Sequence, residues 1–394
     1  MRILCVFGRH NYGDPARGEG VEYTHFLPAF GALGHEVEHF ESFSRTTHAD
    51  FAALNRALLK RVESWQPDVV FTVLMMAEIW LETITLIRNT GAKVVNWSTD
   101  DSWKYRQFSR LIAPAFDVFA TTCPSAPAWY ARDGIHHCVL TQWGAASVDL
   151  AAPKPAADCA YDVTFVGSNY GERSKRINAL RATGIAVECF GHGWPNGAVD
   201  AARLRSIIRD SRISLNFSDA GAGGGRQIKA RIFEVPGAGG LLLTEDAPHL
   251  EDFFQPGREI AVFRDEGDLA ASARRLLDAP HERDAMALAG HERVLREHTY
   301  EERLSGVLDR ARPRSEARSP VDWPRFEQIA RRHSCGPLLR GLRWCLVAAA
   351  SMVWGRQRGP RAARRAVFEL SWRILGRHTY TAAGLPGRMF YRES

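Results

Sequence analysis

The stretch GAGGGRQIKARIFEVPGAGGLLLTED, residues 221–246, contains a glycine-rich loop, a predicted short helix, a small-residue turn and an apolar strand. The predicted helix carries Arg226, Lys229 and Arg231 and ends at the carboxylate of Glu234. Backbone N–H groups at a helix start attract anions, because the helix dipole has its positive end there. A carboxylate beside them can accept hydrogen bonds from the two hydroxyls of a ribose. Together these features predict a site for a phosphate and a diol, as in a nucleotide.

Strands and helices alternate on both sides of this stretch. The predicted strands of the first half are 2–8, 36–41, 68–74, 92–97, 117–122 and 137–142. Those of the second half are 161–167, 186–190, 213–217, 241–244 and 260–263. Strands separated by helical segments of this length predict βαβ units and parallel sheets. The fold class is therefore α/β, with two Rossmann-like halves.

Length and composition divide the 394 residues into two domains and an appendage. The predicted domains are 1–152 and 158–310, joined by the Ala- and Pro-rich segment 151–159. A second exposed linker is predicted at 311–330, and a basic helical tail at 331–394.

The tail differs in charge from the rest of the chain. It holds thirteen Arg, no Lys and two Glu, a net charge of +11, whereas the remainder has 38 basic and 43 acidic residues, a net charge of −5. Residues 344–354 carry no charge but are too few for a transmembrane helix of roughly 20 residues. Residues 361–375 interleave Arg with Trp, Leu and Ile, a pattern typical of a helix on an anionic membrane surface. A charged helix that covers the two domains is the alternative.

Cysteine usage and the N-terminal residues indicate a cytoplasmic protein. The seven cysteines are scattered and form no CxxC pair, which argues against disulfides and zinc. MRILCVFG reads as a first strand and not as a secretory signal. Nucleic-acid binding is disfavoured, because the basic tail lacks any zinc, helix-turn-helix or RNP-type pattern.

Four pieces of the second half occur in an order that resembles a known family. They are YDVTFVGSNYGERSKRI (161–177), IKARIFEVPGAGGLLLTED (228–246), FFQPGREIAVFRDEGDL (253–269) and AGHERVLREHTYEERL (289–304). Together they resemble the CgeB-like, spore-maturation branch of group 1 glycosyltransferases. The likeness covers residues 160–305 well and residues 1–150 loosely. It implies a GT-B fold, in which two Rossmann-like domains face a cleft.

The resemblance also implies a donor site in the second domain. Lys229 and Arg231, with Arg226, would then lie near the diphosphate of a nucleotide sugar, and Glu234 would bind its ribose. A further basic contact is implied after the strand that ends near residue 167. The residues of that contact are Gly167, Ser168, Arg173 and Lys175. Such cations stabilise a departing diphosphate without a metal, so neither a metal nor a cofactor is expected.

One position departs from the family pattern. Related retaining enzymes carry a Glu-x7-Glu pair, and here Arg226 stands eight residues before Glu234. A non-catalytic nucleotide- or glycan-binding GT-B protein is therefore an alternative. A GT-B sugar-nucleotide epimerase is a further alternative. Lys229, Arg231 and Glu234 could also form a simple ion-pair set on a helix surface.

A glycine-containing loop in the first domain is expected to face the cleft. Arg9, His10, Gly18 and Gly20 lie between the first strand and the first helix. Glycine there allows a ligand to approach the backbone closely, although many Rossmann-like domains need glycine only to turn the chain. The spacing is not a clean GxGxxG, which disfavours NAD.

Two adjacent carboxylates follow the strand 92–97. Parallel sheets present their chemistry beyond the carboxyl ends of their strands, so Asp100 and Asp101 should face the cleft. One of them, with Asp101 preferred, is predicted to act as general base on an acceptor hydroxyl. The alternative is a capping role for the helix near Trp103.

The predicted function is hexosyl transfer from a nucleotide-diphosphate sugar to a glycan or lipid-linked acceptor of the cell envelope. The acceptor is expected to enter from the first domain. The basic tail at 331–394 is expected to hold the protein peripherally on the inner membrane face.

Overall fold

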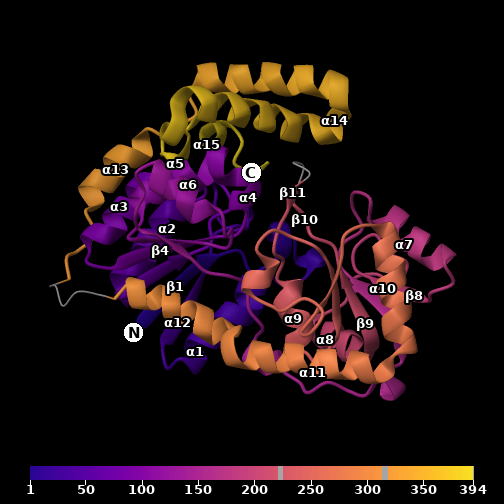
Figure 1. Ribbon diagram of the computed structural model, residues 1–394. Coiled ribbons are helices and arrows are strands. Elements are labelled where there is room, and N and C mark those ends of the chain that lie inside the picture. Colours follow the sequence, from indigo (N-terminus) through magenta and orange to yellow (C-terminus); the bar gives the residue numbers. More distant parts are fainter. Residues whose placement is uncertain (221–224, 313–317, 394) are drawn as a thin grey trace. The chain divides into compact units, whose positions relative to one another are not determined.

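The computed structural model describes residues 1–220, 225–312 and 318–393 (Figure 1). The chain forms two compact units. Unit 1 comprises Met1–Thr141 together with Val307–Ser394, and unit 2 comprises Gln142–Gly306. The C-terminal segment therefore belongs to the same unit as the N-terminal sheet.

Unit 1 is built on a six-stranded sheet in the order β2-β1-β3-β4-β5-β6, with every neighbouring pair parallel. The strands are β1 (Arg2–Phe7), β2 (Glu36–Glu41), β3 (Val69–Thr72), β4 (Lys93–Ser98), β5 (Val118–Thr121) and β6 (Cys138–Leu140). The helices between them are α1 (Leu27–Ala32), α2 (Phe51–Trp65), α3 (Leu81–Asn89), α4 (Asp101–Lys104), α5 (Arg110–Ile112) and α6 (Ala126–Arg132). These strands occur where the sequence predicted them, and the predicted parallel pairing is confirmed.

Both faces of this sheet are covered, so its strands read as continuous apolar runs. Leu4 and Val70 pack with helices α2 and α3 in one core cluster. On the opposite face, aromatic rings meet edge to face: the Phe26 and Trp97 centroids are 5.0 Å apart, and Phe30 and Phe71 are 5.1 Å apart.

Unit 2 is built on a five-stranded parallel sheet in the order β13-β12-β9-β7-β8. Its strands are β7 (Tyr161–Val166), β8 (Val187–Phe190), β9 (Ser211–Asn216), β12 (Leu242–Glu245) and β13 (Ala261–Phe263). Its helices are α7 (Arg173–Ala182), α8 (Ala201–Arg209), α9 (Arg231–Gly237), α10 (Glu266–Asp278), α11 (Pro280–Glu297) and α12 (Tyr300–Arg310), the last of which continues into unit 1. Leu243 packs in the core cluster beside α7 and α10, and Leu242 packs on the other face beside α9. The apolar run LLLTE is thus a strand buried on both faces.

Strand order fixes where each sheet can hold a ligand. In both sheets the first and third strands along the chain are neighbours, β1 with β3 and β7 with β9. The connections leave this pair toward opposite edges of the sheet, which opens a crevice beyond the carboxyl ends of the two strands. The residues that follow β7 and β9 are therefore the first place to search in unit 2.

The predicted cationic helix at 226–234 is wrong in its start and its end. Arg226 belongs to β11 (Gly225–Arg226), which pairs antiparallel with β10 (Asp219–Ala220). Lys229 lies in the turn that follows, and α9 begins only at Arg231, so Glu234 sits in its first turn. The helix does not begin at Arg226, because this residue is part of the short β10–β11 hairpin. Residues 221–224 of the predicted glycine-rich loop lie outside the described residues.

The second small-residue turn, after α9, accommodates the segment that precedes β7. Gly239 has a φ of +79°, and a Cβ there would lie 2.5 Å from the carbonyl oxygen of Ala151. The Ala151 N–H donates to the Gly237 carbonyl at 3.0 Å. Glycine is therefore needed here both for its backbone conformation and for this close approach.

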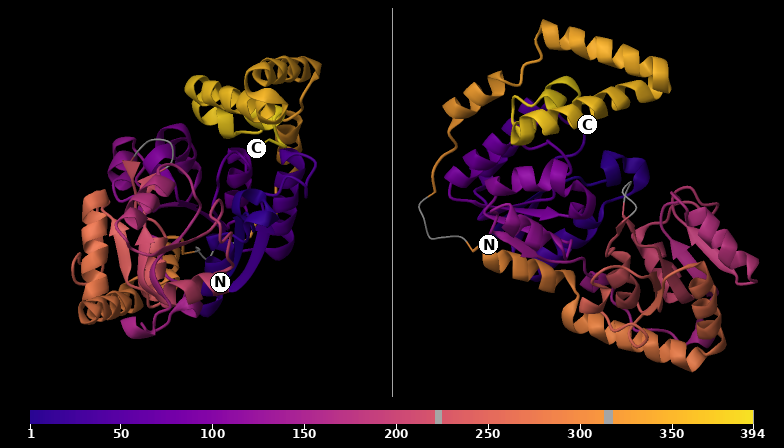
Figure 2. Two further views of the ribbon diagram at one scale, coloured as in Figure 1. Left: turned by 90° about the vertical axis from the view of Figure 1, so that its right-hand side faces the viewer. Right: turned by 45° about the horizontal axis from the view of Figure 1, so that its top comes forward.

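The predicted helical C-terminal extension is present and packs on unit 1. It contains α13 (Trp323–Arg331), α14 (Pro337–Leu375) and α15 (Leu385–Met389). The uncharged stretch 344–354 and the basic helix predicted at 361–375 are both parts of α14, which bends sharply at Gly355 (Figure 2). Phe326 and Tyr380 are buried in the same core cluster as α2 and α3.

His298 follows α11 near the end of unit 2, and its side chain is neutral. Its Nε2 lies 2.8 Å from the Phe253 carbonyl oxygen and therefore donates, while Nδ1 accepts from Arg303 Nη2 at 2.7 Å. The His298 pKa is lowered to about 4, mainly by burial; the hydrogen bond to Phe253 opposes this shift and the Arg303 charge adds to it. Protonation would place a second positive charge against the guanidinium.

Because the pKa of His298 in the folded state lies below its unfolded value, we expect its contribution to be complete above about pH 6.5 and lost as pH falls toward 4. Replacing His298 with Gln should flatten the rise in unfolding free energy between those pH values by roughly 3 kcal/mol. Urea denaturation at several pH values measures the difference. Parallel pH profiles for the wild type and His298→Gln would contradict this assignment.

Candidate functional site

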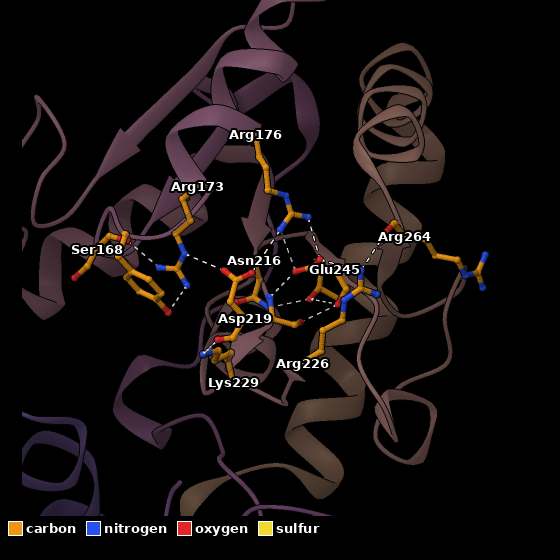
Figure 3. A network of polar contacts seen from close by, with 12 residues as sticks. Ser168, Arg173, Arg176, Asn216, Asp219, Arg226, Lys229, Glu245 and Arg264 are labelled. Carbon is orange, nitrogen blue, oxygen red and sulfur yellow. Dashed lines mark hydrogen bonds and ion pairs between the residues drawn. The ribbon is translucent and has the colours of Figure 1, made fainter. Parts of the chain in front are cut away.

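Polar side chains gather at the carboxyl ends of β7 and β9, where the strand order of unit 2 predicts a crevice. Figure 3 shows Arg173 and Arg176 extending from α7 toward Asp219, which follows β9. Glu245, the last residue of β12, lies between Arg176 and Arg226 in the same view. We call this group, with Lys229, the arginine network.

Arg173 is held by backbone, phenol and carboxylate together. Its Nη1 donates to the Ser168 carbonyl at 2.8 Å, and Nη2 donates to the Tyr170 hydroxyl at 2.8 Å. Its Nε lies 3.5 Å from Asp219 Oδ2, and the guanidinium stacks 3.9 Å from the Tyr170 ring centroid. Only 8% of the Arg173 side chain is exposed, so its position is set before any ligand arrives.

Glu245 joins two arginines from different elements. Its side chain is 6% exposed, and its Oε1 lies 3.1 Å from Arg176 Nη2 and 3.2 Å from Arg226 Nη2. Oε2 accepts the Ser218 backbone N–H at 3.0 Å. A buried carboxylate satisfied in this way fixes α7 and the β10–β11 hairpin to the end of β12.

Lys229 and the Arg176 guanidinium each have a further contact within the site. Lys229 Nζ donates to the backbone carbonyl of Asp219. The Arg176 guanidinium lies 4.4 Å from the Phe217 ring centroid, so its underside is apolar while its edge meets the carboxylates. The network thus presents several cationic groups in a fixed arrangement at the sheet edge, which suits an anion with several oxygens.

Of the donor-site residues predicted after β7, Lys175 does not join the network. Its side chain is 74% exposed and pairs with Glu172 at 3.5 Å on the outer side of α7. Ser168 takes part through its carbonyl group. At Gly167 the backbone is approached by Gly191, where a Cβ would lie 2.4 Å from the Gly167 carbonyl oxygen. This approach explains the glycine at position 191, whereas a Cβ on Gly167 itself would lie 3.1 Å from Phe165 Cζ.

Arg231 and Glu234 form an ion pair within α9. Arg231 Nη1 lies 2.9 Å from Glu234 Oε2, and the Glu234 side chain is 12% exposed. The sequence suggested one ion-pair set of Lys229, Arg231 and Glu234. Arg231 and Glu234 pair with each other, whereas Lys229 points to Asp219. The role of Glu234 at a ribose remains a prediction.

Three members of the network, Arg176, Asp219 and Glu245, were missed in the sequence. Glu245 ends the predicted apolar strand, and the carboxyl end of a parallel strand is the place to expect such a residue. Arg176 follows Arg173 by one helical turn and therefore shares its face. Asp219 gave no signal, because the hairpin that positions it was not predicted.

The predicted loop in unit 1 is internally bonded. Arg9 Nη2 lies 2.8 Å from Glu19 Oε1, and the Arg9 guanidinium lies 4.8 Å from the Tyr23 ring centroid. His10 pairs with Glu19 through a backbone bridge, and the Gly20 N–H donates to the Arg9 carbonyl at 2.8 Å. Gly18, at φ +75°, turns the chain between them.

The surroundings of Asp100 and Asp101 favour Asp100 as the candidate base, whereas the sequence favoured Asp101. Asp101 is 1% exposed and accepts hydrogen bonds from Ser98 Oγ at 2.6 Å, Thr121 Oγ1 at 2.6 Å and the Tyr130 hydroxyl at 2.9 Å. Its carboxylate is therefore occupied in the core. Asp100 is partly exposed and pairs with Lys104 at 2.9 Å, and its side chain makes no capping bond to α4.

Glu22 lies close to Asp100 and was not predicted. Burial raises the pKa of the Glu22 carboxyl above its ordinary value, and the Asp100 charge raises it further. In the described part of the chain, no group of three or more His, Cys, Asp or Glu residues could hold a metal ion.

We expect Glu245→Gln to lower the unfolding free energy by about 2 kcal/mol, because a buried charge partner of Arg176 and Arg226 is lost. Glu172→Gln removes an exposed partner of Lys175 and serves as the matched control, with a change below about 0.5 kcal/mol. Chemical denaturation measures both. Equal effects of the two changes would mean that Glu245 does not organise the network.

Asp101→Asn should destabilise unit 1 by about 2 kcal/mol. Three hydroxyl groups donate to the two carboxylate oxygens of Asp101, and the Asn side chain has a single acceptor oxygen. The neighbouring Asp100→Asn should cost less than about 0.5 kcal/mol, since it loses one partly exposed ion pair. Thermal unfolding of the two variants compares adjacent positions directly. A larger loss for Asp100→Asn would reverse the assignment.

Part of this chain matches a known protein family. Residues 173–309 match a family described as glycosyl transferase-like. None of the curated proteins compared with the chain matches it. The matched range contains α7, the β10–β11 hairpin, α9 and β12, and so includes the whole arginine network.

Several solved structures share the fold at low sequence identity. Sucrose-phosphate synthase from Thermosynechococcus elongatus is 12% identical, with a TM-score of 0.56 over 79% of this chain and 98% of that one. A glycosyltransferase from Rickettsia africae is 12% identical, with a TM-score of 0.55 over 78% and 97%. HepE from Anabaena, in complex with UDP and glucose, is 11% identical, with a TM-score of 0.54 over 78% and 99%.

These likenesses establish the fold. The chain has the two-sheet α/β architecture of GT-B glycosyltransferases, together with a helical C-terminal extension, and its residues 173–309 match a glycosyl transferase-like family.

Proposed function

We propose that this protein transfers a hexosyl group from a nucleotide-diphosphate sugar to a hydroxyl group of a glycan or lipid-linked acceptor of the cell envelope. The family match and the GT-B fold support glycosyl transfer. HepE, which shares the fold, binds UDP-glucose, which supports a nucleotide-sugar donor. The CgeB-like branch remains part of this proposal.

The arginine network is the observation that carries the proposal. Its cations are fixed at the carboxyl edge of the unit 2 sheet, at the point where the strand order predicts ligand binding. When the sugar–phosphate bond breaks, negative charge develops on the leaving diphosphate. Arg173 and Lys229 are preorganised to stabilise that charge, and no metal is required in this scheme. Glu234 is proposed to bind the ribose.

The acceptor is proposed to bind unit 1. In the transfer step, the acceptor oxygen forms a bond to the sugar carbon, the bond to the diphosphate breaks, and the hydroxyl proton passes to a base. Asp100 is the better candidate for that base, because the carboxylate of Asp101 is saturated by three hydroxyl donors. Burial raises the pKa of the neighbouring Glu22 carboxyl, so this group holds its proton more readily than an ordinary glutamate.

A non-catalytic role in binding nucleotide or glycan is the second candidate. It is favoured by Arg226, which stands where related retaining enzymes carry a glutamate and is itself paired with Glu245. A protein of this kind would bind the donor and transfer nothing.

We expect a panel of nucleoside diphosphates and their sugars to contain a ligand that raises the melting temperature. At a hundredfold excess over Kd the stabilisation is about 2.7 kcal/mol. Lys229→Ala and Arg173→Ala should weaken that ligand by about tenfold to a hundredfold, because each removes a charge-assisted contact. Lys175→Ala is the matched control, since Lys175 is exposed and outside the network.

Transfer and donor hydrolysis are then followed with the ligand found. Glu234→Ala and Asp100→Asn should reduce turnover while the protein stays folded. Donor binding without turnover in the wild type would favour the non-catalytic candidate. If no nucleotide stabilises the protein, or if Lys175→Ala weakens binding as much as Lys229→Ala, the proposed donor site is wrong.

A further inference from the structure

The helix α14 forms a hairpin whose outer surface is unusual for a water-exposed helix. The chain reverses at Gly355, where φ is +78°, so residues 337–354 and 356–375 run as two arms that lie side by side in Figures 1 and 2. The arms cross closely, because a Cβ on Gly359 would lie 2.7 Å from Ser351 Cα. We call these two arms the C-terminal hairpin.

The inner side of the hairpin accounts for its stability. Ala350 and Ala363 are buried between the arms together with Met389 and Phe390. The end of the hairpin is fixed to unit 1, where Tyr380 is 1% exposed and its ring lies 5.3 Å from that of Phe108. The inner side therefore already has its packing partners.

The outer side of the first arm is exposed and largely apolar, with Arg340 as an exposed charge one turn before Trp344. Its members follow one another at three- and four-residue spacings and therefore share one helix face. They are Leu338, Leu342, Cys345, Ala349 and Met352, with Trp344 and Val353 beside them. Leu338 is 90% exposed, Met352 84%, Trp344 72% and Val353 71%. We call this set the apolar face.

Such a surface calls for a partner. Single exposed apolar residues are common, but a contiguous row along several helical turns marks an interaction surface. Among the helices that the structure describes, none is long and apolar enough to cross a membrane. The apolar face can therefore lie on a bilayer, within its interfacial layer.

The charges around the apolar face indicate the chemistry of that partner. Arg356, Arg358 and Arg361 follow it directly and are exposed. Within the described chain these three arginines form no ion pair, whereas Arg343 and Arg373 are paired with Glu393 and Glu369. Residues 331–394 as a whole carry thirteen Arg against two Glu. The surface is suited to a negatively charged partner with an apolar interior.

We propose that the C-terminal hairpin docks this protein on an anionic phospholipid surface. The apolar face inserts among the acyl chains near the headgroups, and the arginines beyond Gly355 bind lipid phosphates. A second copy of the chain fits this surface less well, because two strongly basic hairpins would repel each other. The docking does not depend on the proposed transfer activity.

The C-terminal hairpin is attached to unit 1 near the carboxyl edge of its sheet. The residues after the hairpin bind segments that follow β3 and β4: the Tyr380 hydroxyl donates to the Gln107 carbonyl, and the Ala382 N–H donates to Glu82 Oε2 at 3.2 Å. Arg364, in the second arm, contacts Met76, four residues beyond β3.

The test is flotation of the full chain with vesicles of phosphatidylcholine alone and with about one third phosphatidylglycerol. We expect binding to the anionic vesicles, weak binding to the neutral ones, and a loss of binding as NaCl is raised. The variant Met352→Glu/Val353→Glu should reduce the bound fraction by about tenfold or more, since it places charges in the apolar face. These positions are exposed, so the fold should be retained.

The matched control is Leu288→Glu/Leu295→Glu, which changes two half-exposed leucines on α11 of unit 2 and should bind vesicles as the wild type does. Arg356→Glu/Arg358→Glu should reduce binding to anionic vesicles and leave the melting temperature unchanged. Equal binding of the wild type to neutral and anionic vesicles, or full binding by Met352→Glu/Val353→Glu, would overturn the proposal. A salt-resistant dimer that Met352→Glu/Val353→Glu dissociates would assign the face to a second copy instead.

Discussion

Every strand of the two large sheets runs parallel to its neighbours, and the candidate site depends on that constraint. Parallel strands must be joined by crossovers, so the loops at the carboxyl ends all gather at one edge of a sheet. In unit 2 this edge brings together residues that are far apart in the chain. Arg173 comes after β7, Asp219 after β9, and Glu245 ends β12.

Within the network, the carboxylates hold the arginines in position. Several unpaired guanidinium groups at one edge would repel one another and scatter. Glu245 and Asp219 hold Arg176 and Arg173 in place, and Phe217 supports one guanidinium from the apolar side. Fixed cations stabilise a developing negative charge without the cost of reorienting at the moment of reaction. The Arg226–Glu245 pair adds the β10–β11 hairpin to this assembly.

In unit 1, two adjacent carboxylates differ in burial. Asp101 is saturated by three hydroxyl groups and ties β4 to β5 and α6. Asp100, one residue earlier, remains partly exposed near Glu22, whose pKa is raised by burial and by that neighbour. The C-terminal hairpin belongs to the same unit, so a surface suited to anionic lipid and the acidic groups of the sheet edge are parts of one compact body.

The sequence by itself determined the α/β class, the positions of the strands and the basic character of the C-terminal segment. Those features follow from local patterns, such as the apolar run Leu241–Leu243 and the clustering of arginine after residue 331. Tertiary structure decided which charges meet. Lys175 and Arg176 are adjacent in sequence, yet only Arg176 reaches Glu245, because neighbouring residues on a helix point in different directions. The same holds for Asp100 and Asp101, since burial depends on what the rest of the fold places around each side chain.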